Sequence, residues 1–156
     1  NFGCPQKIAK KGHYGAFLLE EPELCCAIVE RMSSGLSVPV SAKIRVLPSP
    51  EDTIELALGL CDAGARVLTV HGRTKEQNKQ HCGRADWGRI RGIVEALEKH
   101  GFGGVPVLAN GGVETFDDAQ ALLAATGAAG VMSAEGLLED PAIFAAQGVP
   151  GFGGAA

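Results

Sequence analysis

Short apolar runs alternate along the chain with longer segments in which apolar residues recur every three or four positions. Runs rich in β-branched residues are typical of strands, and the longer spacing predicts helices that bury one face. We therefore expect strands at residues 38–46, 66–72, 105–110 and 130–133. We expect helices at residues 22–34, 49–63, 86–100 and 115–125, and a last helical turn from Asp140-Pro141.

Residues at the boundaries of these segments support the assignment. Pro22 suits the first turn of a helix, and Thr115 is a good N-cap because its hydroxyl can accept a hydrogen bond from a free backbone N–H. Strands that alternate with helices in this way favour parallel βα units. Polar residues follow the C-terminal end of each strand, which favours a (β/α)8 TIM barrel over a doubly wound sheet.

Four βα units amount to half of such a barrel. We therefore expect an α/β fold that is the C-terminal half of a TIM barrel, with the N-terminal strands missing. Residues 1–146 would form this partial barrel, and the Gly/Ala-rich residues 147–156 a disordered tail. Half a barrel would leave apolar strand residues without an opposite wall, namely Ile44, Val46, Leu68, Val70, Val107 and Leu108. The chain would then need the missing half, in cis or in trans.

Composition narrows the function classes. A formal net charge of −4 gives the chain no bulk electrostatic attraction for nucleic acid, so any RNA contact has to be local. The five cysteines are odd in number and show no C-x-x-C spacing, which favours reduced thiols over a zinc or redox site. We expect no metal site, no membrane span and an intracellular location, cytoplasmic or nuclear.

The first chemical feature is the turn at Gly3-Cys4-Pro5, which holds one thiol in a fixed direction. A second glycine-rich loop follows at residues 12–16. Two such loops before the first clear helix are typical of the rim of an active site. The strand-like segments further on end in polar residues that could face this cysteine.

The second feature is the set of polar residues in and after the strands. Lys43 lies in an otherwise apolar strand. Its side chain could extend to solvent or pair with a carboxylate, or it could contact an anionic or electron-rich ligand. We favour the ligand. A lone histidine is more often structural, but His71 and Arg73 alternate at a strand end and so face the same way. Gly111-Gly112 after Asn110 suits a phosphate or a plain βα turn equally well.

These residues make the chain resemble the tRNA-dihydrouridine synthases, flavoenzymes that reduce uridine in the D-loop of tRNA. The resembling motifs are Asn1-x-Gly3-Cys4-Pro5 with Gly12 and Gly15-Ala16, Lys43-Ile44-Arg45, Val70-His71-Gly72-Arg73-Thr74 and Ala109-Asn110-Gly111-Gly112. The resemblance covers residues 1–144. Residues 4–17, 71–77 and 131–136 are most similar to the eukaryotic branch that acts on tRNA positions 16 and 17.

The resemblance implies FMN as cofactor, NADPH as reductant and tRNA as substrate. Cys4 would donate a proton to C5 of a uracil that receives hydride at C6, since a thiol is mostly protonated at neutral pH. Asn1 and Arg73 would bind the substrate. The cofactor would contact Lys43, His71, Asn110, Gly111, Gly112, Ala134 and Glu135.

One departure from the family pattern concerns Ala134-Glu135, where many members have Gly-Arg. A glutamate side chain cannot bind phosphate, so only backbone N–H groups could do so there.

Two other function classes remain open. One is another FMN-dependent barrel, similar to dihydroorotate dehydrogenase, which the Cys-Pro turn beside the Gly-x-x-Gly-Ala segment disfavours. The other is a non-catalytic fragment that only binds a partner.

Overall fold

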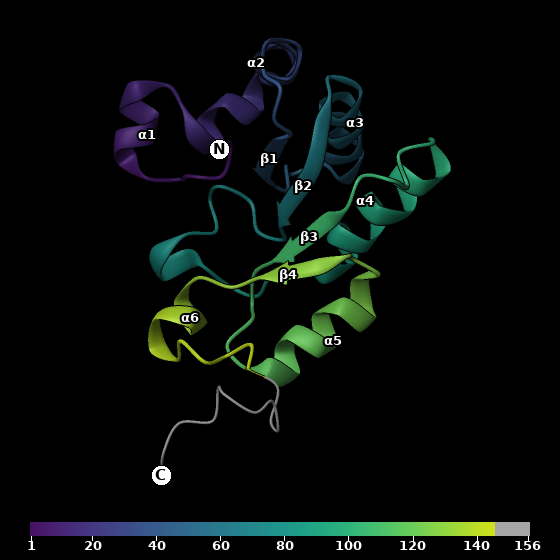
Figure 1. Ribbon diagram of the computed structural model, residues 1–156. Coiled ribbons are helices and arrows are strands. Elements are labelled where there is room, and N and C mark those ends of the chain that lie inside the picture. The colour runs from purple at the N-terminus through teal and green to yellow at the C-terminus, as the bar shows by residue number, and fades with distance from the viewer. Residues whose placement is uncertain (146–156) are drawn as a thin grey trace.

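The computed structural model describes residues 1–145 and shows an α/β fold around one parallel sheet (Figure 1). Its four strands pair in chain order, β1-β2-β3-β4. They are β1 (Val40–Arg45), β2 (Ala65–His71), β3 (Val107–Asn110) and β4 (Gly130–Met132). The predicted parallel βα units are thus confirmed. The predicted tail lies outside the described residues.

Four helices connect and flank the strands close to the predicted bounds. They are α2 (Pro22–Gly35), α3 (Pro50–Asp62), α4 (Trp87–Lys99) and α5 (Phe116–Thr126). The predicted N-cap Thr115 is confirmed, because its side chain accepts from the N–H of Asp118 while the Asp118 carboxylate accepts from the N–H of Thr115. None of the helices in residues 1–145 has the length and apolarity needed to cross a bilayer.

Several short helices were missed by the sequence patterns. Residues 12–16, which we expected to form a loop, overlap the end of the helix α1 (Lys7–Gly12) and the start of the 3-10 helix η1 (Gly15–Glu20). The long loop after β2 contains the 3-10 turn η2 (Lys79–His81), and α6 (Glu135–Glu139) precedes the turn that we expected at Asp140. Helices this short span at most two turns, so their apolar residues show no periodicity.

The helix-covered face of the sheet holds the apolar core. The expectation that the strands' apolar residues lack a wall is wrong for Ile44, Val46, Leu68, Val70 and Val107, which are at most 4% exposed. Alternate strand residues point to opposite faces, and these side chains lie in one cluster with Leu60 of α3, Ile93 of α4 and Leu122 of α5. Leu108, the residue after Val107, points to the opposite face of the sheet and is only partly buried.

The opposite face of the sheet carries polar side chains toward the carboxyl ends of the strands. Lys43 and Arg45 share this face of β1, and the strand register sets Arg45 beside His71 and His71 beside Asn110. At the free edge of β1, Phe2 forms a parallel bridge to Ile44, with its N–H 2.8 Å from the Lys43 carbonyl. That bridge places the turn around Cys4 next to the polar side chains at the carboxyl ends of the strands.

Candidate active site

A pocket of about 430 Å³ opens at the carboxyl ends of all four strands. Figure 1 shows α1, η2 and α6 gathered at this end of the sheet. Eight of the predicted site residues line the pocket: Lys43, His71, Arg73, Asn110, Gly111, Gly112, Ala134 and Glu135. Asn1 and Cys4 are not among the lining residues, but Pro5 and Gln6, which directly follow Cys4, are.

Asn110 links the first strand of the pocket to the last. Its Oδ1 accepts a 2.8 Å hydrogen bond from Lys43 Nζ, and its Nδ2 donates one of 2.8 Å to the Met132 carbonyl. Together the two bonds fix the orientation of the amide and hold the ammonium group in place. Burial, and then the nearby Arg45 charge, lower the pKa of Lys43 to about 8.

His71 is the most strongly perturbed titratable group of the pocket. Burial lowers its pKa to about 3, and the cations Arg45, Lys43 and Arg73 act in the same direction. The imidazole is therefore neutral at pH 7. Its Nε2 lies 3.4 Å from Arg73 Nη1, and since arginine can only donate, Nε2 accepts and the ring proton sits on Nδ1. Arg73 Nε also donates to the Gly83 carbonyl at 3.0 Å.

Arg45 is a pocket residue that the sequence analysis left out of the site. Its side chain is 8% exposed, and Nε donates to the Gly3 carbonyl at 2.8 Å. Its Nη1 donates to the carbonyls of Thr74 and Gln77 at 2.9 and 3.3 Å. The guanidinium therefore joins the Cys4 turn to the loop after β2. Its position two residues after Lys43 on one strand was the signal that could have identified it.

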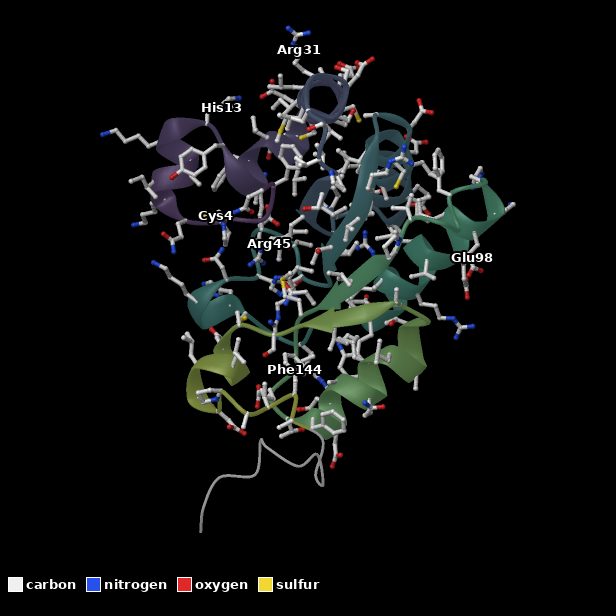
Figure 2. All side chains as sticks on the ribbon, in the orientation of Figure 1. Cys4, His13, Arg31, Arg45, Glu98 and Phe144 are labelled. Carbon is white, nitrogen blue, oxygen red and sulfur yellow. The ribbon has the colours of Figure 1, made fainter. Side chains whose placement is uncertain are left out.

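The Cys4 turn is held by short-range contacts from both sides. Gly3 N–H donates to Asn1 Oδ1 at 3.0 Å, and Ala16 N–H donates to the Cys4 carbonyl at 3.0 Å. A Cβ on Gly15 would lie 2.7 Å from that carbonyl oxygen, so only glycine permits this approach. In Figure 2 Cys4 lies between α1 and Arg45. The arrangement presents one thiol beside the pocket on a fixed backbone.

The glycine pair after β3, Gly111 and Gly112, lines the pocket. Gly111 has φ +110° and Gly112 has φ +77°, conformations that favour glycine. A Cβ on Gly111 would lie 2.8 Å from His71 Cδ2 and 2.9 Å from Ala85 Cβ. Within residues 1–145 the N–H groups of Gly112 and Val113 donate no hydrogen bond, so both are free for an anion.

Two further groups in the pocket had no signal in the sequence. Cys82, from the loop after β2, lines the pocket although nothing distinguished it from the other cysteines. The exposed carboxylate of Glu114 also lines it, near the glycine pair. Among the described residues, no three His, Cys, Asp or Glu side chains gather as metal ligands would.

Comparison with known proteins assigns the chain to a family. A family model described as dihydrouridine synthase (Dus) matches residues 1–150. The chain belongs to the dihydrouridine synthase family. This finding and the parallel four-stranded sheet agree with a partial TIM-barrel domain of that family.

Curated members of the family are similar over nearly the whole chain. A Mus musculus protein named tRNA-dihydrouridine(16/17) synthase NAD(P)(+)-like is 47% identical over 144 residues, covering 92% of this chain and 29% of that protein. A Saccharomyces cerevisiae tRNA-dihydrouridine(16/17) synthase is 43% identical, covering 92% and 33%. A tRNA-dihydrouridine(20a/20b) synthase of the same yeast is 35% identical, covering 93% and 39%. The chain thus spans about a third of the length of these relatives.

Proposed function

We propose that this chain forms part of a tRNA-dihydrouridine synthase that reduces the C5=C6 bond of D-loop uridines, with FMN as cofactor and NADPH as reductant. The observation that carries the proposal is the row of Lys43, Arg45 and His71 on the polar face of the sheet, directly beside the Cys4 turn. Action at positions 16 and 17 is supported by 43% identity to the yeast 16/17 enzyme, against 35% to the yeast 20a/20b enzyme.

The pocket has the chemistry that FMN requires. Lys43 and Arg45 are largely buried and have no carboxylate within 4.0 Å among the described residues, so an anionic ligand would compensate charges that the protein leaves unpaired. The free N–H groups of Gly112 and Val113 would donate hydrogen bonds to a phosphate, as would the backbone N–H groups at Ala134-Glu135. The Glu135 carboxylate has to point away from it.

The chain's own residues would act in defined roles. Bound FMN would supply the hydride that reaches uracil C6. Cys4 would donate the proton to C5, from a turn fixed by Ala16 and Arg45. Lys43, held by Asn110, would place positive charge near the isoalloxazine ring, and neutral His71 would donate a hydrogen bond through Nδ1. Asn1 and Arg73 would hold the base.

We also propose that the pocket is completed by further barrel strands, in cis or in trans. In the described residues the sheet is open at β1, where Phe2 already pairs as the end of a neighbouring strand would. On the same side, α2 exposes Leu24 and Met32, and Leu36 directly after the helix is exposed as well, with exposed fractions between 39% and 50%. An adjacent βα unit would cover both the strand edge and this stripe.

Two measurements on the full-length protein test the proposal. Flavin absorbance of the purified protein should be present, which a non-catalytic fragment would not show. Oxidation of NADPH by the flavoprotein should depend on unmodified tRNA, which an FMN enzyme for a small molecule would not require. Absence of flavin after reconstitution with FMN, or oxidation indifferent to tRNA, would show that the proposal is wrong.

A further inference from the structure

Positive charge is concentrated in two segments of an acidic chain. Residues 1–19 hold three lysines and no Asp or Glu, and residues 73–85 hold four Lys or Arg and one Glu. These segments carry a net charge of +6, although the whole chain carries −4. The total charge of the chain does not reveal this segregation.

The two basic segments meet at the mouth of the pocket. Gln6 and Lys79 both line it, Arg45 joins the carbonyls of Gly3 and Thr74, and Lys75 pairs with Glu20. Figure 1 shows α1 and the segment with η2 on the same side of the sheet, at the carboxyl ends of the strands. The segments therefore form one surface rather than two separate patches.

Five cations of this surface are exposed and lack an acidic partner. We name them the basic rim: Lys7, Lys10, Lys11, Lys79 and Arg84. The ion pairs within residues 1–145 join His13 to Glu21, Lys75 to Glu20 and Glu76, and Arg91 to Glu95, and none involves the rim. Lys75, which is neutralised by Glu20, is accordingly left out of the rim.

We infer that the basic rim binds RNA phosphates on either side of the base that enters the pocket, an inference that rests on the proposed function. A base can reach Cys4 only if the backbone around it crosses the mouth of the pocket, which Lys79 lines together with Gln6, the residue before Lys7. The half-exposed ring of Tyr14 at the end of α1 adds a surface on which an unpaired base can stack. An acidic protein segment could also bind exposed lysines, but it has no bases to stack on the aromatic ring. The combination of lysines and a tyrosine therefore favours RNA as the partner.

Salt dependence of RNA binding tests this inference on the full-length protein. Binding of a fluorescent tRNA transcript is measured by anisotropy across a series of KCl concentrations. The rim variants are K10Q/K11Q and K79Q/R84Q, and the matched control R31Q/K99Q removes two exposed cations on α2 and α4. Figure 2 shows Arg31 and Glu98, the neighbour of Lys99, far from Cys4. Circular dichroism verifies that each variant is folded.

Each lost phosphate contact lowers the slope of log Kobs against log salt by about 0.7–0.9. Each rim pair should therefore lower the slope by about 1–2 and the control by less than about 0.5. Unchanged slopes in the rim variants, an equal loss in the control, or equal binding of an acidic peptide would overturn the inference. Flavin content is measured on the same samples, so a protein that binds RNA through the rim but lacks flavin would refute the proposed function alone.

Discussion

The glycine pair after β3 allows a sharp test because its two members differ in one respect. Both have positive φ, which costs a residue with a Cβ about 1–2 kcal/mol. At Gly112 an added Cβ would have its nearest neighbour, Trp87 Nε1, at 3.7 Å, an ordinary contact. At Gly111 it would meet His71 and Ala85 at 2.8–2.9 Å, closer than carbon atoms can approach.

Gly111→Ala should therefore add an overpacking cost that Gly112→Ala avoids. Overpacking a close-fitting site costs about 1–3 kcal/mol. The expected free energy of unfolding falls by about 1–2 kcal/mol for Gly112→Ala and by about 2–5 kcal/mol for Gly111→Ala. For a domain of about 150–250 residues the difference corresponds to about 2–12 °C in Tm. Urea denaturation of both variants of the full-length protein, with the slope m held constant, measures it.

The two substitutions should also differ in their effect on FMN binding. Gly111→Ala should also displace the His71 ring and weaken FMN binding, whereas Gly112→Ala should alter FMN binding only through its backbone N–H. Fluorescence titration with FMN measures both. Equal destabilisation by the two substitutions would show that His71 and Ala85 move aside with no loss of stability. The close contacts at Gly111 would then make no contribution to the free energy of unfolding.

Four further predictions concern the catalytic groups and the barrel. Cys4→Ala should leave flavin reduction by NADPH intact and stop uridine reduction, as stopped-flow absorbance and dihydrouridine analysis would show. Lys43→Ala and His71→Ala should each weaken or lose FMN binding, and stoichiometric flavin with an unchanged spectrum in both would refute their assignment. Because the pKa of Lys43 is lowered to about 8, FMN affinity should fall as pH rises through 8, up to about tenfold per unit, and Lys43→Met should abolish this dependence. The isolated 156-residue chain should not be a cooperatively melting, FMN-bearing monomer in size-exclusion and thermal-melt experiments.

The main helices and strands could be predicted because each is long enough to show a period. Alternation of buried and partly exposed residues in β1 and the capping box at Thr115 are both local features of the sequence. Lys43, His71 and Asn110 could be nominated because parallel strands end at one edge of a sheet, and the pocket does lie there.

What the sequence could not give are the contacts that depend on loop backbones. The short helix α1 has no periodic signal, and the bonds of Arg45 depend on where the carbonyls of Gly3 and Thr74 point. The supposed lack of a wall for Ile44 and Val70 failed for a related reason. Composition identifies apolar strand residues, but which face of the sheet the helices cover is set by the chain's path in space.

Arg45 connects these loop contacts to the electrostatics of the pocket. A guanidinium stays charged at any pH near neutral, and this one is fixed by three carbonyl oxygens instead of a carboxylate. It therefore holds a permanent positive charge beside Lys43 and His71, and after burial it is the next cause that lowers the pKa of each. Carbonyl dipoles satisfy its hydrogen bonds without neutralising its charge. A bound anion would neutralise it and would raise the pKa of Lys43, so binding of the anion should be accompanied by proton uptake near pH 8.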